Sequence, residues 1–137
     1  MKRILIFALL GLSVSALAWD KPVSGHAYLP EQIKQMQDDE FQNPGMVTVD
    51  EGGALFRTPG YNGKSCASCH GEGDGKLDPK AIARYPVYSA AHRGPLTLQQ
   101  RIAYCREQRL DEFPLTYDDP NLVALEAYGD FAAAARQ

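Results

Sequence analysis

The chain has 137 residues, of which 45% are apolar, and its formal net charge at pH 7 is −3. This length is sufficient for one small domain and too short for two. The acidic balance argues against a nucleic-acid partner, which would require a basic surface. It is compatible with a basic patch on a protein partner.

The first 18 residues have the pattern of a secretory signal peptide. Lys2 and Arg3 precede an apolar run over residues 4–14, and a small-x-small cleavage site ends at Ala18. The run is too short to cross a bilayer, and no second hydrophobic stretch follows. We therefore expect cleavage and export to the periplasm, with no membrane span in the mature chain; an uncleaved anchor is the alternative. Without residues 1–18 the chain keeps 119 residues, with 12 basic and 17 acidic side chains, a net charge of −5.

Residues 19–47 are polar and rich in proline, which predicts a surface arm before the main folded domain over residues 48–137. A short helix is possible at residues 31–37. The acidic run at residues 38–40 has no spaced ligands beside it, so it indicates a solvated face rather than a metal site.

A first long helix is expected from about Thr48, because Thr48 and Glu51 have the spacing of a capping box. Val49, Gly53 and Phe56 then form one buried stripe. Two adjacent glycines, Gly52 and Gly53, disfavour a helix by about 1 kcal/mol each relative to alanine. Their presence predicts the close approach of another backbone.

The segment Cys66-Ala67-Ser68-Cys69-His70 has the spacing at which a c-type haem is attached. The two thiols would join the vinyl groups of one porphyrin, and His70 would be the proximal iron ligand. Zinc and redox dithiol sites also use paired cysteines, but a zinc site lacks its further ligands here, and the flanking glycines do not favour a thioredoxin-like fold. We predict one covalent haem c held by Cys66, Cys69 and His70.

Residues 71–94 are predicted to be loop-like, as in a segment that wraps a haem. The last helix is expected from Pro120, with Asp119 as its N-cap. Its apolar residues recur at helical spacing and should pack on the first long helix. Two terminal helices that cross near a haem site predict a mostly α, class I cytochrome c-like single domain. The residues that repeat in the last helix are Leu122, Leu125, Tyr128 and Ala132.

No methionine follows Met46, so the iron is either five-coordinate or uses another distal ligand. The downstream candidates are His92, in a polar turn, and Cys105. A helix capped by Thr97 would place Leu98, Ile102 and Cys105 on one interior face.

Cys105 is the third cysteine and has no evident partner in the sequence. A free cysteine is usually a small buried hydrophobe. In an exported chain, however, an unpaired thiol is exposed to oxidation, which indicates a functional role. Arg101, Arg106 and Arg109 lie close to it in the sequence. Their positive charge would stabilise a thiolate and attract small anions, although a solvated helix face is the simpler interpretation.

Several motifs together resemble the haem-bearing, C-terminal domain of SoxA, the catalytic subunit of the SoxAX cytochrome of bacterial sulfur oxidation. The resemblance extends over about residues 30 to 130. Its most specific feature is the pair Arg101 and Cys105, since the haem-attachment motif is common to all c-type cytochromes. The motifs are Asp38-Asp39-Glu40-Phe41, Asn43-Pro44-Gly45-Met46, Val49-Asp50-Glu51-Gly52 with Ala54-Leu55-Phe56, residues 63–71, Ala83-Arg84-Tyr85-Pro86, and Gln100-Arg101-Ile102 with Cys105-Arg106.

The resemblance implies that Cys105 is the distal haem ligand, with a persulfide-type sulfur, and that Arg101 lies beside it. It also implies an L-cysteine S-thiosulfotransferase-like activity. Such an enzyme joins thiosulfate oxidatively to a cysteine of a SoxYZ-type carrier protein and passes two electrons through haem to a SoxX-like cytochrome subunit. Family members usually carry an additional N-terminal cytochrome-like domain, which we do not expect in this chain.

Two other functions fit the same residues. One is tetrathionate-forming thiosulfate dehydrogenation, which also uses a cysteine-ligated haem in related cytochromes. The other is a periplasmic electron carrier in which Cys105 only tunes the iron, and thiolate ligation would give such a carrier a low reduction potential.

Overall fold

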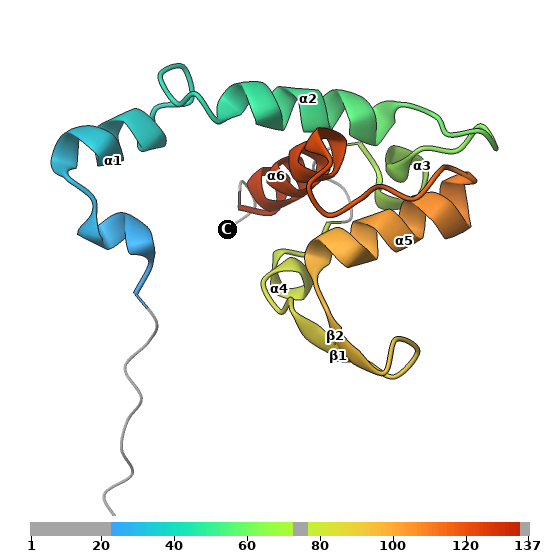
Figure 1. Cartoon of the computed structure of the whole chain (residues 1–137). Helices are drawn as coiled ribbons and strands as arrows, with labels where there is room; N and C mark the ends of the chain where they lie inside the picture. Colours follow the sequence, from blue (N-terminus) through green and yellow to red (C-terminus); the bar gives the residue numbers. More distant parts are fainter. Residues whose placement is uncertain (1–22, 73–76, 135–137) are drawn as a thin grey trace, which may run out of the picture.

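The structure is a computed structural model that describes residues 23–72 and 77–134 (Figure 1). It is a mostly helical, single domain, as predicted from the sequence. The predicted signal peptide, residues 1–18, lies outside the described residues. Within the described part no helix is both long and apolar enough to span a membrane.

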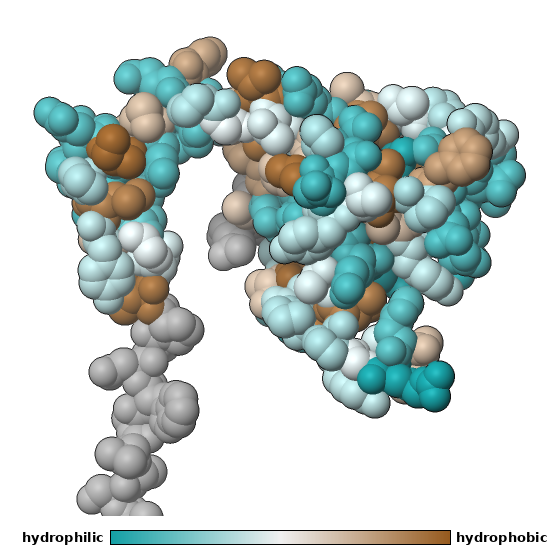
Figure 2. All heavy atoms as spheres, in the orientation of Figure 1, coloured by the Kyte–Doolittle hydropathy of each residue, from teal (hydrophilic) through white to brown (hydrophobic). Residues whose placement is uncertain are grey.

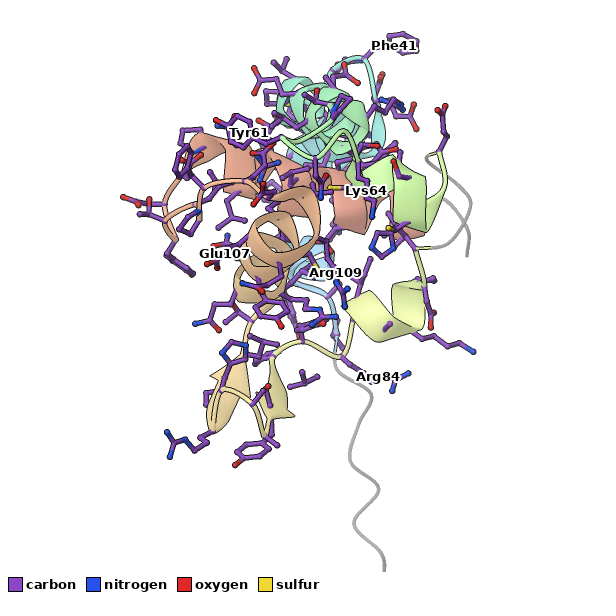
Figure 3. The ribbon with its side chains drawn as sticks, turned by 90° about the vertical axis from the view of Figure 1, so that its right-hand side faces the viewer. Phe41, Tyr61, Lys64, Arg84, Glu107 and Arg109 are labelled. Carbon is purple, nitrogen blue, oxygen red and sulfur yellow. The ribbon has the colours of Figure 1, made fainter. Side chains whose placement is uncertain are left out.

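The N-terminal part is a 3-10 helix, η1 (Gly25–Tyr28), followed by α1 (Glu31–Asp38). The helix expected at residues 31–37 is therefore present. Figure 1 shows α1 standing apart from the other helices, and no residue from 23 to 45 is buried. Apolar side chains are visible on the surface of this part in Figure 2. Ile33 of α1 is among the exposed large apolar residues. Phe41 is fully exposed and points away from the body in Figure 3.

The core forms where α2 (Met46–Arg57) crosses α6 (Pro120–Ala134). Both predicted glycines lie at this crossing. The carbonyl oxygen of Ala124 occupies the space where a side chain on Gly52 would begin, and the ring of Tyr128 would lie 3.1 Å from a Cβ on Gly53. The prediction of a close backbone approach is confirmed. The predicted apolar residues of α6 are all buried, as is Phe56 of α2: Leu122, Leu125, Tyr128 and Ala132.

The predicted start of α2 is wrong. The helix begins at Met46, two residues before the expected Thr48, and Gly45 is its N-cap without a side-chain hydrogen bond. An Asx-type turn prepares this start, since the Gly45 N–H donates to Asn43 Oδ1 at 2.9 Å. Thr48 therefore lies inside the first turn, where its spacing from Glu51 has no capping role. At α6 the prediction is confirmed, because Asp119 Oδ1 accepts a hydrogen bond from the Asn121 N–H at 2.8 Å.

The predicted loop at residues 71–94 lies partly outside the described residues, since 73–76 are not described, and the rest of it is less loop-like than predicted. It includes a short helix, α4 (Pro79–Ile82), which begins after the N-cap Asp78, and the strand β1 (Val87–Ser89). This strand pairs antiparallel with β2 (Gly94–Leu96), with Tyr88 opposite Pro95. The prediction failed because three-residue strands with glycine and proline carry too little alternation to be detected.

The helix α5 (Leu98–Leu110) begins as predicted. Thr97 Oγ1 accepts from the Gln100 N–H at 3.2 Å, and Gln100 Oε1 accepts from the Thr97 N–H at 2.9 Å. The helix ends at Asp111, which has a left-handed backbone with φ 58°. Figure 1 shows α5 next to α6, on which it packs.

Candidate functional site

The predicted site residues converge on one cavity of about 330 Å³ between α3 (Cys66–His70), α4, α5 and α6. Cys66, His70, Arg101 and Cys105 all line it. Cys69 is not part of the lining and is exposed on α3. The rest of the wall is mostly apolar and includes Phe56, Leu77, Ile82, Leu98, Ile102 and Leu125.

The helix α3 is short, and reciprocal hydrogen bonds fix its first turn. The Ser68 N–H donates to Ser65 Oγ at 3.2 Å, and the Ser65 N–H donates to Ser68 Oγ at 3.0 Å. Ser65 is buried, with 7% of its surface exposed. The helix ends at Gly71, whose φ of 75° favours glycine. These constraints hold the two cysteines and the histidine on a single turn beside the cavity.

His70 lies at the α2 side of this cavity, with its ring centroid 6.3 Å from that of Phe56. The Phe56 ring in turn packs on Tyr128 at 5.1 Å. The imidazole is itself exposed in this structure. The α2–α6 core therefore supports the wall against which the imidazole rests, which links the main packing interface directly to the site.

The helix α5 supplies the opposite wall. Leu98, Ile102 and Cys105 recur at intervals of four and three residues and line the cavity, as their helical spacing predicted. Arg101, four residues before Cys105, lines it with them. Arg101 is exposed, and its Cζ lies 5.6 Å from the centre of the Tyr104 ring.

His92, the other candidate distal ligand, is not among the residues that line this cavity. It lies in the turn between β1 and β2, with its ring edge-on to Tyr104 and the centroids 5.8 Å apart. The geometry therefore favours Cys105 over His92 as the candidate for the distal haem ligand.

Cys66 and Cys105 are close enough to influence each other electrostatically. Burial raises the pKa of the Cys66 thiol, the Arg106 guanidinium opposes this rise, and Cys105 adds to it. Arg106 is itself buried, with 8% of its surface exposed, and its Nη2 pairs with Glu112. The pair fixes the Arg106 guanidinium near Cys66, and the Glu112 carboxylate partly offsets the effect of its charge on that thiol. The sequence had indicated arginines near Cys105, but it did not separate the buried Arg106 from the exposed Arg101 and Arg109.

The cavity fits a haem better than the two other uses of paired cysteines. Its wall is apolar, with an imidazole and a thiol facing it from different helices, which is the donor set of a thiolate-ligated haem. In the described ranges no three His, Cys, Asp or Glu side chains come together as a metal site, so zinc is not supported. The only strand pairing within those ranges is the two-stranded hairpin, so the βαβ context of a thioredoxin-like dithiol is not found there.

Residues 51–134 match the family model described as SoxA/TsdA, cytochrome c domain. The chain belongs to this family. Its cytochrome c domain implies haem c as the cofactor. Because the match spans the cavity, α5 and the α2–α6 core, the family assignment covers the whole candidate site.

Curated relatives carry two different activity names. The chain is 33% identical over 112 residues to the L-cysteine S-thiosulfotransferase subunit SoxA of Pseudaminobacter salicylatoxidans, covering 80% of this chain and 38% of that protein. A similar match, 33% over 111 residues, is to SoxA of Rhodovulum sulfidophilum. The chain is also 37% identical over 75 residues to the thiosulfate dehydrogenase of Allochromatium vinosum, and this match covers 49% of this chain and 28% of that protein.

The fold is similar to a chain in the crystal structure of SoxXA from P. pantotrophus. The TM-score is 0.64 at 24% identity, and the match covers 74% of this chain and 38% of that chain. The present chain thus spans well under half the length of these relatives.

Proposed function

We propose that this chain is a SoxA-like haem enzyme that oxidatively conjugates thiosulfate to a cysteine of a sulfur-carrier protein in the periplasm. The observation that carries the proposal is the convergence of Cys105 and Arg101, from α5, with Cys66 and His70, from α3, on one mostly apolar cavity. An electron-transfer cytochrome would need the haem-attachment residues but would not need a cysteine and an arginine together on the distal side.

In this proposal Cys66 and Cys69 hold one haem c covalently, His70 is its proximal ligand, and Cys105 is its distal ligand. The bound haem supplies a one-electron acceptor next to the sulfur of Cys105, so electrons leave without a long transfer path. The apolar side chains from α4, α5 and α6 keep water away from the reacting sulfurs, which strengthens charge interactions inside the cavity.

The sulfur chemistry can be written with its electrons balanced. The Cys105 thiolate and thiosulfate form a sulfur–sulfur bond, which gives a Cys105 thiosulfonate and releases two electrons. The thiolate of the carrier then attacks the sulfane sulfur, takes over the thiosulfonate group and regenerates the Cys105 thiolate. Overall, a carrier thiol and thiosulfate yield the conjugate, one proton and two electrons.

Arg101 would bind and orient the anion. The thiosulfate dianion and a thiolate repel each other, and a cation is needed to hold the two sulfurs together. Arg101 lies one helical turn before Cys105 and lines the same cavity. A guanidinium presents several N–H donors in one plane, which suits the oxygens of a sulfonate group better than a lysine ammonium does.

The electrons require a second acceptor, and we propose a SoxX-like cytochrome subunit, by analogy with the SoxXA crystal structure to which the fold is similar. The carrier would be of the SoxYZ type, as the resemblance of the sequence implies. The predicted signal peptide supports a periplasmic site, where haem c is assembled.

The relative named thiosulfate dehydrogenase makes formation of tetrathionate the second candidate function. In that reaction a second thiosulfate takes the place of the carrier thiolate in the same exchange. The two reactions can be separated by incubating the haem-loaded protein with thiosulfate and a ferricytochrome acceptor, with and without a carrier protein that has one accessible cysteine. Conjugation predicts acceptor reduction that depends on the carrier, and a carrier mass increased by one thiosulfonate group. Reduction of the acceptor without the carrier, with tetrathionate as product, would favour the dehydrogenase. If thiosulfate causes no reduction of the acceptor at all, electron transfer is the function that remains.

A further inference from the structure

The cavity of about 330 Å³ that the proposed haem would occupy is called the haem cavity from here on. A second cavity, of about 500 Å³, adjoins it, and Ile82, Tyr85 and Leu98 line both. We call it the acidic cavity, because Glu126 and Asp130 of α6 line it and no lysine, arginine or histidine is among its described lining residues. It contains neither Cys105 nor Arg101, so the sulfur chemistry makes no use of it.

The acidic cavity offers several hydrogen-bond acceptors. Glu126 and Asp130 are one helical turn apart and therefore face the same side of α6. Gln99 of α5 donates its Nε2 to Glu126 Oε2 at 2.6 Å. Its Oε1 is buried and has no partner in the described part of the chain. Thr97 is occupied in capping α5. An incoming group that donates hydrogen bonds and carries positive charge would complement this set.

Among the residues that the structure describes, neither carboxylate has a partner of opposite charge. Burial, and then the neighbouring Glu126, raise the pKa of Asp130 above its ordinary value of 3.8. A metal ion is a poor candidate for a positively charged partner of Glu126 and Asp130, because the described residues bring no third carboxylate, histidine or cysteine to this pair.

The rest of the wall suits an organic group. Tyr85 and Tyr117 line the acidic cavity together with Pro79 and Pro86. Aromatic faces attract organic ammonium groups as well as their alkyl parts. The volume also lies within the range of about 300–1,000 Å³ that is usual for small-molecule sites.

We propose that the acidic cavity binds the ammonium group of an organic cation, with its nitrogen between Glu126 and Asp130 and its alkyl part against Tyr85 and Tyr117. A free amine and a lysine side chain of a protein partner offer this same chemistry. The proposal does not depend on the sulfur reaction, because its residues and its probe are different.

The test is a titration of the full, haem-loaded protein with n-butylammonium chloride, followed by amide chemical shifts in NMR. Saturable shifts of Gln99, Tyr117, Glu126 and Asp130 are expected, and equal concentrations of 1-butanol or sodium butyrate should not produce them. Asp130→Asn combined with Glu126→Gln should weaken binding by about tenfold, as two partly exposed ion pairs would. Glu107→Gln is the matched control, since Glu107 is exposed on α5 and lies outside the acidic cavity (Figure 3).

Asp130→Asn alone should weaken binding less than the double variant does. This single variant is available if the double variant misfolds, because no hydrogen bond involves the Asp130 side chain in the described structure. A blocked Gly-Lys-Gly peptide that binds more tightly than butylammonium, with its norleucine counterpart inactive, would identify a protein lysine as the source. Tighter binding of butylammonium would identify a free amine. The proposal is overturned if butylammonium gives no saturable shifts, if 1-butanol binds as well, or if both carboxylate variants bind like the wild type.

Discussion

Gly52 of α2 lies directly against the carbonyl oxygen of Ala124 in α6. A Cβ on Gly52 would overlap that oxygen and would lie 2.8 Å from the Cβ of Tyr128. Gly52→Ala should therefore lower the free energy of unfolding by about 2–3 kcal/mol, as overpacking in a close-packed interface does. Chemical denaturation of the haem-loaded protein measures this. Gly25→Ala, at a position where no described atom would lie within 4 Å of the new Cβ, should change it by less than about 0.5 kcal/mol. A Gly52→Ala variant as stable as the wild type would contradict the described crossing of α2 and α6.

The buried pair of Arg106 and Glu112 gives a second prediction. Glu112→Gln leaves the Arg106 guanidinium buried without its counterion, and the side chains of the pair are only 9% and 21% exposed. Removing one partner of a buried ion pair typically costs 3–5 kcal/mol, and the partial exposure of Glu112 reduces the expected loss to about 2–3 kcal/mol. Thermal unfolding should show this loss, whereas Glu107→Gln on the exposed face of α5 should leave the midpoint nearly unchanged. Equal midpoints for both variants would show that the pair does not stabilise the fold.

Asp130 should make stability depend on pH in a defined direction. Because its pKa is raised above 3.8 in the folded chain, the folded state holds the proton more tightly than the unfolded state does. The fold therefore loses stability as pH rises from below 3.8 through the raised value. Asp130→Asn mimics the protonated form, so its melting temperature should exceed that of the wild type at pH 7 and equal it at pH 3. Asp50→Asn, at an exposed position of α2, serves as the control. A lower melting temperature for Asp130→Asn at pH 7 would contradict the assignment.

The ligand role of Cys105 can be tested without turnover. Electron paramagnetic resonance of the oxidised protein should show low-spin iron with g values typical of thiolate ligation, and Cys105→Ala should abolish them. His92→Ala should leave the spectrum unchanged, because His92 packs on Tyr104 outside the haem cavity. A spectrum that survives Cys105→Ala but changes in His92→Ala would transfer the role to the histidine.

Much of the helical frame was predictable because its signals are local. The capping residues Thr97 and Asp119 mark the starts of α5 and α6, and the glycine pair indicates the helix crossing. The start of α2 was missed because a turn at Asn43, and not Thr48, prepares it.

The site was predictable to the extent that spacing determines it. Three- and four-residue intervals on α5 place Arg101 and Cys105 on one face, and the attachment motif is contiguous. The partner of Arg106 was not predictable, since the contact with Glu112 depends on the left-handed turn at Asp111. The acidic cavity was missed for a similar reason, because α4, α5, α6 and Tyr117 assemble it from distant parts of the chain.

The most direct test of the proposed function is the turnover of Arg101→Ala with thiosulfate, a carrier protein and an electron acceptor. This variant should keep the haem and the thiolate spectrum while losing most of its thiosulfate-dependent turnover, and Arg101→Lys should recover only part of it. Arg84→Ala, which removes an exposed arginine outside the haem cavity (Figure 3), should turn over like the wild type. Normal thiosulfate-dependent turnover in Arg101→Ala would contradict the anion-binding role on which the proposed function rests.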